Sequence, residues 1–355
     1  MNQPVQPIEM DAFLASLRNR TTHGVSMIAI DGGELPVSVH LHESSSLIFT
    51  FTGAANRNGR TLPQFASIGL KNHAPASFIR LADPSLVRND EMRLAWYAGH
   101  EEFELQKILP DLLRQMIDSL GATRVVFLGG SGGGFAALYY SLQIPDSVAI
   151  TLNPQTNLSR YHAGHRKMYR AVCWPSLDEN APLDAVIEAN LGPLYANQFT
   201  NTVVCIQIAS DFFHLTRQFA PFIAALPSDY LDRLIVRVAN WGVKGHKPAP
   251  SSIWIPWVNA ALSAPETTAT SIEATWAMQN PLQLPLLKRL THDFDRDVLV
   301  AAAIGKTGNI EKPLQPSPLK LHTPGASRDK RIAAELARTA TNELLNTQSY
   351  ERSLL

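Results

Sequence analysis

A run of glycine and serine between two apolar segments constrains this 355-residue chain more than any other feature. The segment 125–128 is apolar, positions 129–134 hold only glycine and one serine, and the chain then turns apolar again. This pattern predicts a buried strand, a tight turn and a helix. Within the turn, Gly129-x-Ser131-x-Gly133 matches the nucleophile elbow, in which a strained bend lifts a serine hydroxyl above the edge of a sheet. Glycines are needed there because a Cβ atom would collide across so sharp a bend.

A phosphate-binding turn or a plain connection is the alternative interpretation of the same glycines. A P-loop requires a lysine followed by serine or threonine, and the turn has no lysine. A dinucleotide-binding turn requires a third glycine, but Phe135 stands at that place after Gly130-x-Gly132. The strand before the turn and the helix after it favour the elbow.

Strand and helix patterns alternate along most of the chain. The turn Asp31-Gly32-Gly33 separates the first two strand patterns and predicts a hairpin. Later strands alternate with helices, which indicates an α/β fold with a mostly parallel sheet covered by helices on both faces. The expected strands are 25–30, 35–41, 47–52, 78–81, 125–128, 148–152, 203–208 and 234–239. The expected helices include 103–120 and 251–262, and each contains a proline that could break it, Pro110 and Pro256.

Changes in composition divide the chain into three parts. Residues 1–22 form a polar N-terminal lead with a short amphipathic segment, 23–264 form the main domain, and 265–355 form a proline-interrupted C-terminal extension. The extension predicts an arm over the domain with a terminal helix at 329–345, which could also pack on a second copy of the chain. An insertion at 153–201 is expected, because about 50 residues separate two neighbouring strands and simple crossovers need far fewer.

A serine hydroxyl needs a base, and the base needs an orienting acid. Asp211 follows the strand 203–208 directly, and His246 lies in the loop after the next strand. Both residues therefore emerge at the carboxyl end of the sheet, where Ser131 also lies. Ser131, Asp211 and His246 are our candidate catalytic residues.

Other histidines and aspartates compete for these roles. His214 lies three residues beyond Asp211 and is better placed to support that carboxylate than to act as the base. His100 precedes the elbow and would reverse the order of the triad along the chain. Asp229 and Asp232 precede the last strand, so we expect them at the wrong end of the sheet.

The insertion carries a cluster of basic side chains followed by Trp174-Pro175. A solvated helix face explains such a cluster, and a lid that presents positive charge to an anionic part of a substrate explains it as well. The basic residues are Arg160, His162, His165, Arg166, Lys167 and Arg170.

The overall composition excludes several classes of function. Lysine plus arginine equals aspartate plus glutamate, 31 each, so no net field points to nucleic acid or an acidic membrane. Residues 1–17 lack the pattern of a secretion signal, and no apolar stretch approaches the roughly 20 residues of a membrane span. Cys173 and Cys205 lack metal-ligand spacing and are too few for a disulfide framework. We expect a cytoplasmic protein that needs no metal or cofactor and acts on a small molecule.

These motifs resemble those of the α/β-hydrolase superfamily over roughly residues 23–264. The resemblance rests on Gly129-Gly130-Ser131-Gly132-Gly133, Asp211 and Gly245-His246. More narrowly, the chain resembles hydrolase-like proteins encoded among bacterial surface-polysaccharide genes, some related to acetyltransferases. The segments that carry this second likeness are Phe51-Thr52-Gly53, Trp96-Tyr97-Ala98-Gly99, Asp211-x-x-His214 and Gly245-His246-Lys247.

The superfamily's usual His-Gly loop after the third strand is missing, and Phe51-Thr52-Gly53-Ala54-Ala55 stands in its place. Gly53 and Ala54 therefore leave room for a substrate, and we expect the amides of Gly132 and Ala54 to bind the oxyanion. The predicted activity is hydrolysis of a small-molecule or saccharide ester through an acyl-serine. Transfer of the acyl group to a sugar hydroxyl, and a binding protein that kept only the fold, are the alternatives.

Overall fold

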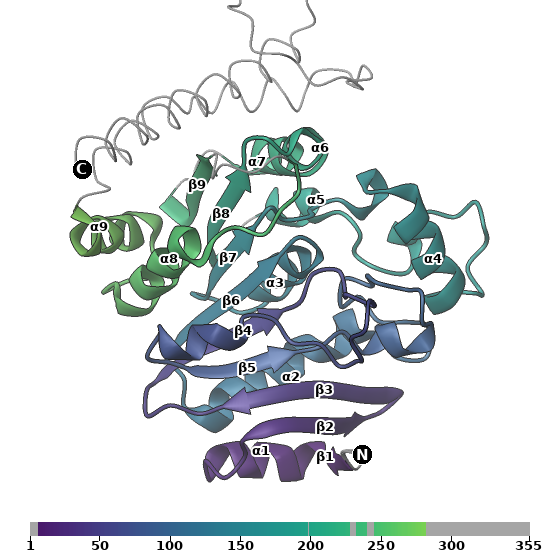
Figure 1. Cartoon of the computed structure of the whole chain (residues 1–355), viewed down its shortest axis with the longest axis horizontal. Helices are drawn as coiled ribbons and strands as arrows, with labels where there is room; N and C mark the ends of the chain where they lie inside the picture. Colours follow the sequence, from purple (N-terminus) through teal and green to yellow (C-terminus); the bar gives the residue numbers. More distant parts are fainter. Residues whose placement is uncertain (1–5, 198, 228–231, 240–244, 282–355) are drawn as a thin grey trace, which may run out of the picture.

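A twisted β-sheet runs through the middle of the molecule in a computed structural model of the chain, which describes residues 6–197, 199–227, 232–239 and 245–281 (Figure 1). Within these ranges nine strands make one sheet, in the order β1-β2-β3-β5-β4-β6-β7-β8-β9. The strands are β1 (Pro7–Glu9), β2 (Gly24–Ile30), β3 (Gly33–His40), β4 (Ser46–Phe51), β5 (Ser77–Leu81), β6 (Arg124–Gly130), β7 (Val148–Leu152), β8 (Thr202–Ile208) and β9 (Leu234–Ala239).

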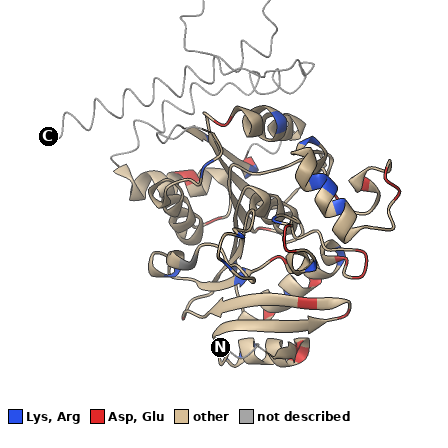
Figure 2. Cartoon of the chain, turned by 45° about the vertical axis from the view of Figure 1, so that its right-hand side comes forward, with Lys and Arg blue, Asp and Glu red and all other residues tan. Residues whose placement is uncertain are grey.

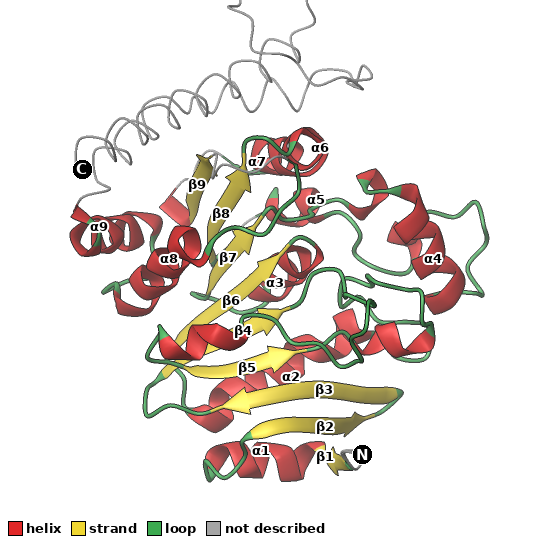
Figure 3. Cartoon of the chain, viewed as in Figure 1, coloured by secondary structure: helices red, strands yellow, loops and turns green. Residues whose placement is uncertain are grey.

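The sheet is mostly parallel, as the alternation of strands and helices predicts. β4 pairs in parallel with both β5 and β6, and β6 to β9 continue in parallel to the far edge. The hairpin expected around 31–33 is also confirmed, because β2 and β3 pair antiparallel from Ile30 and Gly33 onward. The carboxyl ends of the parallel strands thus lie along one side of the sheet, where the loops that follow them meet (Figure 3).

Helices cover both faces of the sheet. Alternate residues of a strand point to opposite faces, so Phe49 packs in the core that contains α1, α2 and α3, whereas Ile48 packs in the core that contains α8 and α9. The longer helices are α1 (Met10–Arg18), α2 (Leu105–Leu120), α3 (Gly132–Leu142), α4 (Ala163–Cys173), α8 (Ser251–Ser263) and α9 (Ala269–Gln279). The shorter ones are η1 (Ile68–Asn72), η2 (Pro84–Arg88), η3 (Leu158–Arg160), η4 (Leu183–Ala185), α5 (Leu191–Tyr195), α6 (Phe212–His214), η5 (Leu215–Phe219) and α7 (Ala220–Ala225).

Pro110 and Pro256, which could have broken the two expected helices, are both accommodated within them. Pro110 lies inside α2 and cannot donate to the carbonyl of Gln106 one turn earlier. The hydroxyl of Tyr139 donates to that carbonyl instead, at 3.3 Å, so the proline leaves no unsatisfied acceptor there. Pro256 likewise lies inside α8 without ending it.

The described parts of the two segments that flank the predicted main domain pack on it more closely than composition suggests. The expected polar lead contributes β1, which pairs with β2, and α1, whose Phe13, Leu14 and Leu17 are buried in the core. In the first part of the expected C-terminal extension, α9 packs on α8, with Trp257 and Trp276 stacked at 4.8 Å. The terminal helix predicted at 329–345 lies outside the described residues. No helix in the described ranges combines the length and apolar character required to cross a bilayer.

Candidate active site

Ser131 occupies the bend between β6 and α3 in a strained conformation. Its φ of 55° and ψ of −119° lie in a region that residues with a Cβ atom rarely adopt. The neighbouring glycines explain how the chain holds it there. A Cβ on Gly129 would lie 2.0 Å from the carbonyl oxygen of Gly133, and one on Gly132 would lie 2.3 Å from Leu94. Glycine at position 129 is therefore a steric requirement of the bend, and a side chain at position 132 would have to displace Leu94.

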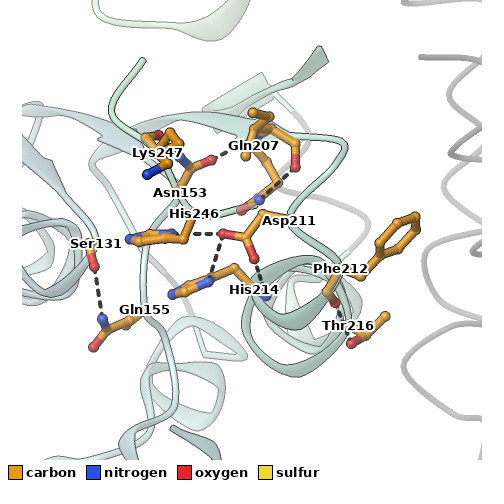
Figure 4. A network of polar contacts seen from close by, with 11 residues as sticks. Ser131, Asn153, Gln155, Gln207, Asp211, Phe212, His214, Thr216, His246 and Lys247 are labelled. Atoms are coloured by element: carbon orange, nitrogen blue, oxygen red, sulfur yellow. Dashed lines mark hydrogen bonds and ion pairs between the residues drawn. The ribbon is translucent and has the colours of Figure 1, made fainter. Parts of the chain in front are cut away.

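Asp211 and His246 meet beside this serine, although 35 positions separate them in the chain. Asp211 follows β8, is 4% exposed, and accepts a 2.7 Å hydrogen bond from Nδ1 of His246 through Oδ2. The imidazole lies between the aspartate and the serine (Figure 4). The structure thus brings the three predicted side chains together in the order that a serine nucleophile requires.

Asn153 helps to hold His246 in place. It follows β7 directly, and its Oδ1 accepts a 2.7 Å hydrogen bond from the amide of Ile208 at the end of β8. Its Nδ2 donates to the carbonyl of Lys247 at 3.1 Å. The loop that carries the histidine is therefore tied to two strand ends (Figure 4).

A second histidine shares the same carboxylate. Nδ1 of His214 lies 2.8 Å from Oδ2 of Asp211, and its backbone amide donates to Oδ1 at 3.2 Å. The His214 ring is buried and stacks on the His246 ring, with centroids 4.0 Å apart and planes 15° from parallel. The sequence predicts His214 as a supporting group for Asp211, and this is where the structure places it.

Burial and hydrogen bonding shift the pKa values of Asp211 and His214 in opposite directions. Burial alone would raise the pKa of Asp211, but the contacts from His214 and His246 outweigh it and hold that pKa far below its usual range. Burial lowers the pKa of His214, even though the nearby carboxylate opposes the shift. At neutral pH the site thus contains an ionised aspartate and a neutral buried histidine.

The same three residues have the composition of a metal site, and their ligand atoms lie within 4.8 Å of one another. A metal ion binds a histidine in the plane of its ring. The rings of His214 and His246 are stacked nearly parallel, so no point lies in both planes at bonding distance. The arrangement fits hydrogen bonding to Asp211 better than joint coordination of a metal.

The loop that carries two of the expected oxyanion donors, Gly53 and Ala54, lies against Ser131. A Cβ on Gly53 would lie 3.5 Å from the Cβ of Ser131, which places this loop against the elbow. The amide of Thr52 donates to the hydroxyl of Tyr97 and that of Ala55 donates to the carbonyl of Arg93, both at 2.7 Å. Between them, the amides of Gly53 and Ala54 have no hydrogen-bond partner among the described residues.

Gly132 supplies the remaining expected donor. It begins α3, and the first amides of a helix lack partners within the helix. Free amides at a helix start favour negative charge nearby. Gly132, the next residue in the chain, and the loop 53–54 thus both lie beside Ser131.

Gln155 is a contact of Ser131 that sequence reasoning missed. Its Nε2 donates to the serine Oγ at 2.9 Å (Figure 4). Its position just after β7 could have pointed to it, because residues that follow parallel strands gather at the carboxyl end of the sheet, and Asp211 was identified in that way. A single glutamine in a loop, however, matches no motif.

Two of the competing candidates, His100 and Asp232, make contacts with other residues than the triad. His100 is buried, and its backbone pairs with Phe103 in an isolated bridge. Asp232 accepts a hydrogen bond from the hydroxyl of Thr270 at 3.2 Å. Asp229 lies outside the described residues.

Beyond Asn153 and Gln155, the insertion at 153–201 also reaches the site through Tyr161. This ring makes edge contact with Trp96 at 6.1 Å and lies 5.9 Å from the ring of His214. α4 carries several of the basic residues of the insertion (Figure 2). Arg170 binds the backbone carbonyls of 178, 179 and 181, and Arg166 binds that of Tyr161, so both guanidinium groups hold the insertion together.

No protein-family model and no curated protein matches this sequence. One similar solved structure is the capsule O-acetyltransferase of Neisseria meningitidis serogroup A. The match covers 67% of this chain and 94% of that chain, with 14% identity and a TM-score of 0.51. The esterase EstE7, an HSL homologue from a metagenome library, matches 71% of this chain and 92% of its own, with 14% identity and a TM-score of 0.42. MPT51 of Mycobacterium tuberculosis matches 67% of this chain and 96% of its own, with 11% identity and a TM-score of 0.44. The chain has the α/β-hydrolase fold, which confirms the predicted fold class.

Proposed function

We propose that this protein is a serine hydrolase that cleaves a carboxylic ester through a covalent acyl-enzyme on Ser131. One observation carries the proposal: His246 lies between Ser131 and Asp211, and its Nδ1 is bonded to the aspartate. That bond fixes the tautomer in which Nε2 is free to accept a proton. A strained serine, a base and a buried acid in this order are the parts of a nucleophilic catalyst.

In the first half of the reaction, Nε2 of His246 takes the proton of Ser131 as Oγ attacks the ester carbonyl. The ionised Asp211 stabilises the imidazolium that forms. The amides of Gly132 and Ala54 bind the oxyanion, with that of Gly53 close by. The intermediate then collapses, and the leaving alcohol takes the proton from His246.

In the second half, water gives a proton to His246 and attacks the acyl group. The bond between the acyl carbon and Oγ breaks, and Ser131 recovers its proton from the imidazolium. A sugar hydroxyl in place of water would make the same protein an acyltransferase. The substrate class we propose is a small-molecule or saccharide ester, and no step requires a metal or cofactor.

A labelling experiment tests the proposal directly. The intact protein is treated with a fluorophosphonate probe, the modified peptide is mapped, and turnover of p-nitrophenyl acetate is followed. We expect one label on Ser131, and none in Ser131→Ala. Ser159→Ala is the matched control, because Ser159 is exposed in the insertion and bonds only Asp184 among the described side chains.

Two results would overturn the proposal: a folded wild-type protein that reacts with neither reagent, or undiminished labelling of Ser131→Ala. The first would favour the non-catalytic alternative. Adding saccharide acceptors to the ester assay then separates the two enzymatic outcomes. Acylated sugar in place of free acid would identify a transferase.

A further inference from the structure

Gln155 is hydrogen-bonded to the elbow through its backbone as well as through its side chain. It is fully buried three residues after β7, and its backbone amide donates to the carbonyl of Ser131 at 3.1 Å. The amide of Ser131 in turn donates to the carbonyl of Leu152 at 2.9 Å. The loop after β7 and the elbow therefore form one rigid unit, and Gln155 has little freedom to leave the serine.

Trp96 determines which end of the Gln155 amide faces the serine. The indole N–H is a donor only, and it contacts Oε1 of Gln155. The opposite end of the amide, Nε2, must then be the group that lies 2.9 Å from Oγ of Ser131. The usual ambiguity between the two ends of a glutamine is resolved by this donor.

The hydrogen bond leaves the serine hydroxyl with one arrangement suited to reaction. A hydroxyl has one proton and two lone pairs. The N–H of Gln155 occupies a lone pair, so the proton of Ser131 is directed elsewhere, and His246 lies on the open side (Figure 4). A donor fixed on Oγ is also worth most when that oxygen carries negative charge.

We infer that Gln155 is a catalytic residue that stabilises negative charge on Oγ of Ser131, both when the serine attacks and when it leaves. The inference rests on the acyl-serine mechanism proposed above. As the bond between Oγ and the acyl carbon forms, the serine proton passes to His246. When that bond breaks, its electron pair returns to Oγ, which takes a proton from His246. Gln155 donates a hydrogen bond in both steps and exchanges no proton.

Two variants of Gln155 distinguish this catalytic role from a purely structural one. Gln155→Met removes the donor at similar volume, and we expect the rate of fluorophosphonate labelling to fall about 100-fold, as for loss of an oxyanion donor. Gln155→Glu keeps the shape and the acceptor for Trp96 but replaces the donor with a carboxylate. Its labelling rate relative to wild type should fall further as the pH rises and the carboxylate ionises.

The matched control is Gln106→Met. Gln106 is another buried glutamine bonded at both ends, to the carbonyl and the amide of Glu188 at 3.1 and 2.9 Å. We expect this variant to lose similar thermal stability and to label within about threefold of wild type, because it has no contact with the serine.

The outcomes distinguish the inference from the proposed function. If wild type labels and Gln155→Met labels equally fast, Gln155 is not catalytic, whereas the proposed function stands. If Gln155→Met does not fold, Gln155→Glu decides: a rate within threefold of wild type at every pH would overturn the inference. A wild-type protein that never labels refutes the proposed function itself.

Discussion

Replacing Asp83 with asparagine should remove a pH dependence of folding stability that the wild-type protein carries between about pH 4 and 6. Asp83 is buried at the start of η2 and accepts hydrogen bonds from the amides of Tyr97 and Ser85, at 2.7 and 3.1 Å. Burial raises its pKa to about 6, although these hydrogen bonds oppose the shift. The residue matters to the site because the hydroxyl of Tyr97 binds the amide of Thr52, next to the expected oxyanion loop.

The size of this change in unfolding free energy follows from the pKa shift of Asp83. The pKa rises from 3.8 to about 6, and each unit corresponds to about 1.36 kcal/mol. The folded protein keeps the Asp83 proton up to about pH 6, whereas the unfolded chain loses it near pH 4. The folded state therefore binds more protons in this window, and the free energy of unfolding falls by about 3 kcal/mol as the pH rises through it.

The assay is urea unfolding of wild type and Asp83→Asn at several pH values from 3.5 to 7.5. The asparagine also loses one acceptor for a buried amide, at a cost of about 1 to 3 kcal/mol that does not vary with pH. The difference in unfolding free energy, wild type minus variant, should thus fall by about 3 kcal/mol across the range. A difference that stays constant with pH would refute the reasoning.

Two further predictions concern the triad and the elbow. His246→Ala should be nearly as inactive on p-nitrophenyl acetate as Ser131→Ala, and the double variant no worse, because triad members act as a unit; additive losses would contradict a shared mechanism. Gly133→Ala should lower the thermal midpoint and abolish turnover, since its Cβ would lie 2.3 Å from a backbone oxygen at the end of β4. Gly164→Ala in α4 is the control, because its Cβ would meet no atom within 4 Å, and an equal loss in both variants would exclude the steric explanation.

Much of the fold was predictable because its signals are local. The apolar run 125–128 and the glycines after it define the elbow without reference to any other part of the chain. Asp211 was predictable for a topological reason, since parallel strands end at one edge and bring the residues after them together. The strand Pro7–Glu9 was missed because three residues are too few to show an alternating pattern.

The contact of Gln155 with Ser131 was not predictable, because the orientation of its amide depends on a partner far away in the sequence. Its orientation is set by Trp96, which lies 59 positions earlier and has a φ of 56°. The segment that carries this tryptophan is placed by tertiary packing, with Leu94 against Gly132. Only the folded structure brings these groups together, and no local pattern records it.

The two histidines on Asp211 can be assigned different tasks from their surroundings. His214 is buried, and burial lowers its pKa, so it stays neutral and adds no positive charge beside the carboxylate. A charged His214 would compete for Asp211 and repel an imidazolium stacked 4.0 Å away. His214 still shares Oδ2 of Asp211, but a neutral ring adds no charge that would offset the carboxylate beside His246, whose side chain is 37% exposed and lies toward Ser131. The burial of His214 thus favours the role that we propose for His246, which is to carry the serine proton.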